Sequence, residues 1–355
     1  MKHNLHILVL LFVAGSLLLS ACSGSVIGAS SWPGLTADGE TAYLASASRI
    51  FAVNVKDGTL KWSYPDITAK TKLQFFASPS LENGTVIAGD FGHSLYGLAK
   101  DTGLLQWQFD GAKNRWVASP LVIGDTIVAP NADRHIYGLD IKGVQKWVFA
   151  TKESNWSQPA TDGKLAFVPS MDHYVYALDA ATGNLVWSVD AGGAIPSNAL
   201  YLQDSKAVVV GKLASELLAL SAADGKELWR AKTEGSIWSY PVVYEGALYL
   251  GDYAGNAYKI DPATGEIAWK KPLGSIITGA PVATSEGVVF NTSAGLLTML
   301  DADSNQGSRV ETGVKLNSTP VLAGDKIIVP LTKDDILLEA YDLKGAKVWS
   351  FTLPK

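Results

Sequence analysis

The chain has 355 residues, of which 47% are apolar and 18% charged, and it contains 11 tryptophans and a single cysteine. This composition is that of a globular protein and excludes a disordered tail or a coiled coil. One cysteine excludes both a disulfide framework and a cysteine-ligated metal cluster, and a net charge of −5 without any basic block argues against a nucleic-acid partner, because phosphate binding needs clustered lysine and arginine.

Residues 1–21 have the pattern of a lipoprotein signal peptide. An apolar stretch over residues 7–19 is shorter than the roughly 18 residues that a membrane-spanning helix needs. It runs into Leu19-Ser20-Ala21-Cys22, which resembles a bacterial lipobox, a motif whose cysteine is acylated and begins the mature chain. We therefore expect removal of residues 1–21, lipid on Cys22 and a short tether over residues 22–29. The alternative is an ordinary signal peptide with an incidental cysteine.

Eight repeat units, each about 40 residues long, account for the rest of the chain. Seven tryptophans fall in one register with nearly constant spacing, except that the last spacing is two periods long. They are Trp62, Trp107, Trp147, Trp187, Trp229, Trp269 and Trp349. One tryptophan is therefore missing, and we place its slot at Arg309. A second register, of prolines from Pro33 to Pro320 with Ala199 in the fifth slot, gives the same count of eight.

Each unit reads as about four short strands. Apolar runs of four to six residues, rich in β-branched and aromatic side chains, are bounded by Gly, Asp, Asn and Pro. The helix-like spacing of Leu213, Leu217 and Leu220 aligns with a strand of another unit, so we interpret it as strand too. Four strands repeated eight times predict an all-β, eight-bladed β-propeller over residues 30–355. Its tryptophans are expected to pack between neighbouring blades.

The turn before each tryptophan strand is expected to need a residue with positive φ. Glycine occupies this place, four residues before the tryptophan, at Gly58, Gly103, Gly183, Gly225 and Gly265. In the seventh unit Asn305 takes the place. The repeat frame starts near Ser30 and ends with the Trp349 strand. No strand is therefore left for exchange between the first and last blades, unless Val26-Ile27 serves.

One motif resembles the tryptophan-docking repeat of the PQQ-type propeller family. It stands as Ala177-Leu178-Asp179-Ala180-Ala181-Thr182-Gly183-Asn184-Leu185-Val186-Trp187 and recurs at residues 259–269. The resemblance implies the fold far more specifically than the function. Quinoprotein dehydrogenases, one branch of the family, bind pyrroloquinoline quinone (PQQ) and Ca²⁺ on the axis and usually have a vicinal cysteine pair, which is impossible here. The outer-membrane assembly lipoproteins of the BamB type form a second branch, similar in lipobox, blade number and length.

The segments before the prolines carry the candidate interaction surface. Aromatic side chains and an arginine stand there in several units, at Phe76, Arg115, Trp116, Trp156 and Trp238. In a propeller these segments ring one face and its channel mouth, and aromatic residues with arginine are the composition of interaction hot spots. The alternative is that these aromatic side chains fill gaps between inner strands.

Other polar residues are interpreted as structural. The histidines His93, His135 and His173 belong to different units, which argues against a shared metal ion. Aspartates recur in the turn between the second and third strands, as Asp90, Asp172 and Asp252, where aspartate commonly bonds to nearby backbone. We therefore predict no catalytic residue and no metal site.

These observations predict a lipid-anchored, monomeric, non-catalytic scaffold without a cofactor. Its partners are expected to be envelope proteins, with a barrel-assembly complex as the candidate implied by the BamB resemblance. We expect it on the periplasmic face of the outer membrane in a host with two membranes, and on the extracellular face of the plasma membrane otherwise. The alternatives are a quinoprotein-like dehydrogenase using PQQ and Ca²⁺, and a surface lipoprotein that senses a ligand.

Overall fold

The computed structural model describes residues 33–333 and 335–353, and their regular secondary structure is strand throughout. The predicted signal peptide, Cys22 and the tether lie outside the described residues. Within the described ranges, four consecutive strands form each sheet, in the antiparallel order first, second, third, fourth. No helix in these ranges is long and apolar enough to cross a membrane.

The first four sheets follow one another in the chain. Blade 1 contains β1 (Gly34–Ala37), β2 (Thr41–Ser46), β3 (Arg49–Asn54) and β4 (Leu60–Tyr64). Blade 2 contains β5 (Ser80–Glu82), β6 (Thr85–Gly89), β7 (Leu95–Ala99) and β8 (Leu105–Phe109). Blade 3 contains β9 (Leu121–Ile123), β10 (Thr126–Asn131), β11 (His135–Asp140) and β12 (Gln145–Ala150). Blade 4 contains β13 (Ala160–Thr161), β14 (Leu165–Pro169), β15 (Tyr174–Asp179) and β16 (Leu185–Asp190).

The remaining four sheets repeat this plan. Blade 5 contains β17 (Leu200–Leu202), β18 (Ala207–Lys212), β19 (Glu216–Ser221) and β20 (Glu227–Lys232). Blade 6 contains β21 (Val242–Tyr244), β22 (Ala247–Gly251), β23 (Asn256–Ile260) and β24 (Ile267–Pro272). Blade 7 contains β25 (Val282–Ala283), β26 (Val288–Asn291), β27 (Leu296–Leu300) and β28 (Gln306–Glu311). Blade 8 contains β29 (Val321–Ala323), β30 (Lys326–Lys333), β31 (Ile336–Asp342) and β32 (Lys347–Thr352).

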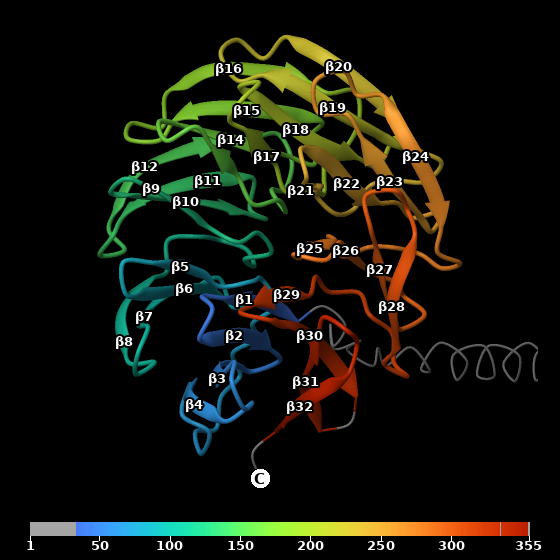
Figure 1. The fold of residues 1–355 in the computed structure, drawn as a ribbon. Coiled ribbons are helices and arrows are strands. Elements are labelled where there is room, and N and C mark those ends of the chain that lie inside the picture. The colour runs from blue at the N-terminus through green and yellow to red at the C-terminus, as the bar shows by residue number, and fades with distance from the viewer. Residues whose placement is uncertain (1–32, 334, 354–355) are drawn as a thin grey trace, which may run out of the picture. The chain divides into compact units, whose positions relative to one another are not determined.

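These sheets follow one another around a ring, with the first strand of each nearest the centre and the fourth outermost (Figure 1). The predicted eight-bladed β-propeller is therefore confirmed. The stretch containing Leu217 and Leu220 is β19, a strand as interpreted from the sequence. The middle strands are buried almost continuously because neighbouring blades cover both of their faces, whereas the outer strands alternate between buried and exposed residues.

The core is divided among the junctions between blades. In the described residues, each apolar cluster joins side chains of two neighbouring blades, and the clusters together include every junction of the ring. The cluster between blades 8 and 1 includes Leu44, Phe51, Leu338 and Trp349. Because blade 1 consists of β1 to β4 and blade 8 of β29 to β32, the ring closes by side-chain packing, without strand exchange within the described residues.

Tryptophans of the outer strands reach across these junctions. Nε1 of Trp147 donates to the carbonyl oxygen of Ala180 in the next blade at 3.0 Å, and Trp349 donates in the same way to Val55 of blade 1 at 2.9 Å. Trp62, Trp187, Trp229 and Trp269 make equivalent bonds. Trp107 differs, because its buried Nε1 has no partner among the described residues.

The turn glycines adopt the expected conformation, with φ between 70° and 75° at the five predicted positions. Blade 7 departs from the expectation by one residue. The residue with positive φ there is Ser304, at 65°, and not Asn305. The turn of blade 7 is as short as those of blades 3 and 8, where Gly143 and Gly345 follow their aspartate by three residues.

The slot of the missing tryptophan is also displaced by one residue from the predicted position. In blade 4 the cross-strand pairs Tyr176↔Ser188 and Ala177↔Trp187 follow one another. In blade 7 the pair Thr298↔Arg309 is equivalent to the first of these, so Ser308 occupies the tryptophan position. Ser308 Oγ donates to the carbonyl oxygen of Leu343 in blade 8 at 3.1 Å, as the indole N–H does elsewhere. The placement of the slot at Arg309 was therefore wrong.

Candidate functional site

The segments that lead into the first strands of blades 2 to 8 line the axis of the ring. We number the residues of each segment backwards from the proline that precedes the first strand, or from Ala199 in blade 5. Residues at −4 and −2 are buried, whereas residues at −3 and −1 are partly exposed. Ala280, at −1 in blade 7, is the exception and is buried. This is the period-two alternation of an extended chain. The residues at −3 are Phe76, Val117, Trp156, Pro196, Trp238, Thr278 and Asn317.

Trp116 belongs to the buried set. It stands at −4, whereas Trp156 and Trp238 stand at −3, and an offset of one residue turns a side chain to the opposite side of an extended segment. Trp116 is 0% exposed, packs against Phe109 and donates from Nε1 to the carbonyl oxygen of His93 at 2.9 Å. Its assignment to the interaction surface is therefore corrected, and Trp116 is a core residue.

Residues at −3 from six blades meet in one pocket, which we call the mouth pocket. Its volume is about 500 Å³. It is lined by Val117, Trp156, Pro196, Trp238, Tyr253, Ile276, Thr278, Ser293, Lys315 and Asn317. Because so many blades contribute, the pocket lies on the axis, and it brings together tryptophans of two blades that are not neighbours in the ring. Trp238 lies 6.3 Å from Tyr253, ring centre to ring centre, and the indole N–H of Trp156 is buried without a hydrogen-bond partner among the described residues.

Phe76 and Arg115 lie together in a second cluster beside the mouth. The rings of Phe76 and Phe91 are 4.6 Å apart, and the Arg115 guanidinium lies 5.4 Å from the centre of the Phe91 ring. Phe91 and Tyr253 were not predicted. Each directly follows the recurrent turn aspartate of its blade, at Asp90 and Asp252, and this shared position was the signal that could have found them.

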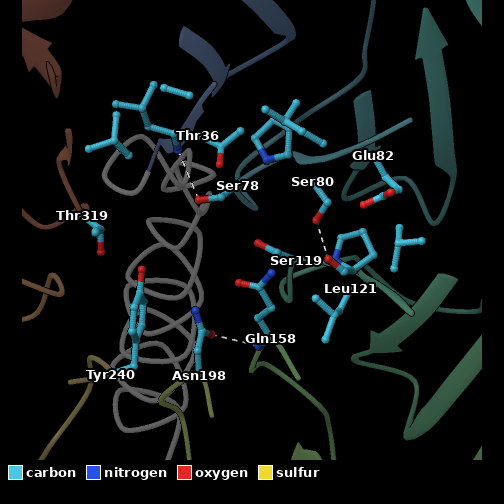
Figure 2. A pocket seen from close by; sticks show the side chains of 17 residues that line it. Thr36, Ser78, Ser80, Glu82, Ser119, Leu121, Gln158, Asn198, Tyr240 and Thr319 are labelled. Atoms are coloured by element: carbon cyan, nitrogen blue, oxygen red, sulfur yellow. Dashed lines mark hydrogen bonds between the residues drawn. The ribbon is translucent and has the colours of Figure 1, made fainter. Parts of the chain in front are cut away.

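A ring of neutral polar side chains lies one step further along the channel. The −1 residues Ser78, Ser119, Gln158, Asn198, Tyr240 and Thr319 line a pocket of about 370 Å³. Figure 2 shows Gln158 beside Asn198, whose Oδ1 accepts a hydrogen bond from the Gln158 backbone N–H at 2.8 Å. Burial raises the pKa of the Tyr240 phenol. The channel therefore changes from an aromatic mouth to a hydroxyl- and amide-lined interior.

Turn aspartates hold the mouth segments in place. Asp172 accepts hydrogen bonds from the backbone N–H of Tyr174 at 3.0 Å, from that of Lys152 at 2.9 Å and from the hydroxyl of Tyr176 at 2.7 Å. Asp133 and Asp252 make equivalent sets of three bonds. The predicted turn role of the recurrent aspartates is confirmed. One carboxylate joins its own turn, a core tyrosine and the segment that leads to the mouth.

Buried tyrosines, most of them hydrogen-bonded to a turn aspartate, are expected to make the folded protein less stable at alkaline pH. Burial, with a contribution from the neighbouring aspartate, raises the pKa of Tyr96, Tyr137, Tyr176 and Tyr258, and burial raises that of Tyr249 to about 12. Because these folded-state values lie above the unfolded value of about 10, the stability is fully present below pH about 10 and is lost as the pH rises towards the folded values. We expect the denaturant midpoint to fall above pH about 10, with tyrosinate absorbance appearing together with the loss of circular dichroism. Tyrosine titration in a protein that keeps its fold would contradict this expectation.

The histidines do not converge. His93 and His173 sit in equivalent turns with φ of 85° and 78°, and His135 contacts Asp133 of its own turn. In residues 33–333 and 335–353, no group of three or more His, Cys, Asp or Glu side chains is placed to hold a metal ion.

The family model described as outer membrane protein assembly factor BamB matches residues 14–115, 153–236, 171–329 and 255–355, which together make up most of the chain. The chain belongs to this family. The family resemblance drawn from the repeats is thereby confirmed for this BamB-family propeller.

Individual relatives are distant. Outer membrane protein assembly factor BamB of Bordetella pertussis is 22% identical over 266 residues, which are 72% of this chain and 58% of that protein. Tetrathionate hydrolase of Acidithiobacillus ferrooxidans is 25% identical over 143 residues, 33% of this chain and 29% of that protein. Each match spans less than two-thirds of the relative's length. The crystal structure of BamB from Moraxella catarrhalis has a TM-score of 0.73 at 17% identity, over 87% of this chain and 94% of that chain, which shows the shared fold.

Proposed function

We propose that this BamB-family chain is a non-catalytic interaction scaffold that serves outer-membrane protein assembly and binds envelope proteins at its channel mouth. The observation that carries the proposal is the concentration of partly exposed aromatic side chains, with an arginine, around one end of the channel. Trp156, Trp238 and Tyr253 form one half of this surface, and Phe76 with Phe91 and Arg115 forms the other. Tyr253 is 47% exposed. Aromatic and arginine side chains dominate the energetics of protein interfaces.

The two halves suit an extended polypeptide with apolar and acidic side chains. The mouth pocket offers indole and phenol faces to apolar groups, and Arg115 and Lys315 offer positive charge at its edge. The scaffold presents these groups on turns and on segments that the turn aspartates hold by hydrogen bonds, so little ordering is needed when a partner binds. A surface held in one conformation in this way suits a scaffold that binds partner proteins.

A lipid on Cys22 is the second element of the proposal. It would hold the propeller at a membrane through the tether of residues 22–29. In a host with two membranes this places the chain on the periplasmic face of the outer membrane, where proteins of outer-membrane assembly act. In a host with one membrane the same anchor would place it on the extracellular face of the plasma membrane.

The described channel does not fit the quinone and calcium pair of the dehydrogenase branch. Ca²⁺ takes six to eight oxygen ligands, typically several of them carboxylates. The side chains that line the interior pocket are hydroxyls, amides and apolar groups, with Glu82 as the one carboxylate among them. The chain also lacks the cysteine pair, since Cys22 is its single cysteine.

Photo-crosslinking in living cells tests the proposed surface. A photoreactive amino acid at Phe76 or Tyr253 is expected to give adducts with components of outer-membrane protein assembly, because both positions border the mouth. Asp162 is the matched control, since it lies in the exposed turn between the first two strands of blade 4, at the opposite end of the blade. Adducts with these components from Asp162 alone, or only with unrelated proteins from the mouth, would overturn the proposal.

A further inference from the structure

The −1 residues form a ring of uncharged polar side chains inside the channel, which we call the interior ring. Its members come from six blades and are Ser78, Ser119, Gln158, Asn198, Tyr240 and Thr319. All six are partly exposed, and all line the same pocket of about 370 Å³. In Figure 2 the Tyr240 hydroxyl extends toward the space between Thr319 and Gln158. Hydroxyl and amide groups therefore surround one space on the axis.

Half of the interior ring has polar groups that are free to bind a ligand. Three members already accept hydrogen bonds from backbone N–H groups, through Oγ of Ser78, Oδ1 of Asn198 and Oγ1 of Thr319. The hydroxyls of Ser119 and Tyr240 and the side-chain amide of Gln158 make no hydrogen bond to the described residues. A hydroxyl both donates and accepts, and an amide does so at separate atoms. These three groups suit a ligand that also donates and accepts.

The charge of this pocket favours an uncharged ligand. Among the described residues that line it there is no lysine, arginine or histidine, and Glu82 is the one carboxylate. An ion that leaves water without a partner of opposite charge loses far more free energy than a neutral polar group that forms hydrogen bonds. A phosphate or carboxylate ligand would find no cation in the pocket and would be repelled by Glu82. Anionic ligands are therefore disfavoured.

Aromatic side chains stand at the mouth end of the interior ring. Trp156 precedes Gln158 by two residues and Trp238 precedes Tyr240 by two, a separation of about 7 Å along an extended segment. Both tryptophans line the mouth pocket. The face of an indole ring offers apolar surface to the C–H groups of a ligand. A ligand that combines an apolar face with many hydroxyl groups would therefore match both sets of residues.

We propose that the interior ring binds one unit of a neutral saccharide. A sugar ring has hydroxyls that each donate and accept, together with C–H faces that pack on aromatic rings. A protein cavity of about 150 Å³ already holds benzene, so this pocket of about 370 Å³ has room for a six-membered sugar ring with its hydroxyls. The inference goes beyond the scaffold function proposed for the mouth surface.

A polypeptide backbone fits the interior ring less well. Its N–H and C=O groups alternate along the line of an extended chain, as they do in a sheet. The free groups of Ser119, Gln158 and Tyr240 instead belong to the same position of three different blades, so they lie around one level of the channel. A compact ring with hydroxyls on its circumference matches this arrangement.

Saturation-transfer NMR on the full chain, purified in a detergent without a sugar headgroup, tests the proposal. D-Glucose, D-galactose and D-mannose are the probes, and D-glucuronate, D-galacturonate and D-mannuronate are their anionic counterparts. We expect saturable binding of at least one of the neutral sugars. Its uronate should bind at least about tenfold more weakly, because the added carboxylate has no cation to pair with in the pocket.

Variants of the interior ring locate the binding. Tyr240→Phe and Gln158→Ala should each weaken binding about fivefold, as expected for the loss of one hydrogen bond. Tyr244→Phe is the matched control, because it removes the same atom from blade 6 outside the pocket, and it should bind like the wild type. If Tyr240→Phe fails to fold, Ser119→Ala replaces it, with the same expected loss.

Three results would overturn the proposal. The first is no saturable binding of any of the three neutral sugars, and the second is binding of the uronates as tight as that of their neutral counterparts. The third is wild-type binding by every variant of the interior ring. Preferential binding of N-acetyl-triglycine amide, a neutral backbone without side chains, would equally reject a sugar in favour of a polypeptide. Each of these results leaves the crosslinking test of the mouth surface unaffected, so the two proposals fail separately.

Discussion

Replacing Trp349 by alanine is expected to lower the free energy of unfolding by about 3–5 kcal/mol, the range for removal of large buried aromatic side chains. Trp349 packs in the cluster shared by blades 8 and 1, and its Nε1 donates to the Val55 carbonyl at 2.9 Å. In the described residues no strand is exchanged across this junction, so side-chain packing and such hydrogen bonds close the ring. The measurement is the denaturant midpoint together with the m-value.

Trp107 provides the matched control for this prediction, because its Nε1 has no acceptor among the described residues. Phenylalanine at either position keeps a ring and removes the indole N–H. Trp349→Phe should therefore cost about 1 kcal/mol more than Trp107→Phe, the value of one hydrogen bond. Equal losses would show that the bond to Val55 contributes nothing. A Trp349→Ala protein as stable as the wild type would show that the ring is held closed elsewhere.

Trp116→Ala is expected to cost about 3–5 kcal/mol of stability, whereas Trp238→Ala should cost less than about 1 kcal/mol and weaken partner binding by about 2 kcal/mol or more. Trp116 is fully buried against Phe109 and Tyr137, and Trp238 is partly exposed in the mouth pocket. Denaturant unfolding measures the first effect. The yield of partner adducts from a crosslinker at Phe76 measures the second.

Replacement of Val117 distinguishes the effect on stability from the effect on partner binding within one segment. It stands next to Trp116 and lines the mouth pocket, so Val117→Ala should leave stability almost unchanged and reduce binding less than Trp238→Ala does. The opposite pattern, with a stable Trp116→Ala protein and an unfolded Trp238→Ala protein, would reverse the assignment of the two tryptophans. Loss of stability in both would mean that the mouth aromatics serve packing alone.

The eight-bladed architecture could be predicted from the sequence because each unit repeats the same pattern of four short strands. Two independent registers, of tryptophans and prolines, agree on eight units, and a short apolar run such as β19 can be interpreted by alignment with its equivalents when its own spacing suggests a helix. The physical basis is that every blade must bury both faces against neighbours of the same kind. Local ambiguity in one unit is therefore resolved by the others.

Errors arose where one residue decides which way a side chain points. In blade 7 a shorter turn displaces both the positive-φ residue, Ser304, and the tryptophan slot, Ser308, by one position from the prediction. In the segments before the prolines, the same offset separates the buried Trp116 from the partly exposed Trp156. Spacing measured in whole units is tolerant of such shifts, whereas the face of an extended chain alternates with every residue.

The sequence predicted part of the candidate surface, and contacts in the structure added Phe91 and Tyr253 to it. Of the residues to which the sequence pointed, Trp156 and Trp238 line the mouth pocket, whereas Phe76 and Arg115 contact Phe91 beside it. That these residues form an interaction surface stays a prediction. The sequence could not show that Phe91 and Tyr253 join them, because these residues come from turns whose approach to the axis depends on the curvature of the whole ring. The position of Phe91 and Tyr253 in the folded ring, and not their residue type, brings them to this surface.

Because side-chain packing and hydrogen bonds close the ring, without an exchanged strand among the described residues, the last blade is essential for covering the apolar faces of its two neighbours. Until blade 8 is in place, the face of blade 1 that carries Leu44, Phe51 and Val53 has no cover, and blade 7 leaves a second apolar face open. The bond between Trp349 and Val55 joins residues 294 positions apart. A chain that ends before blade 8 would thus expose two apolar faces, and such faces promote aggregation.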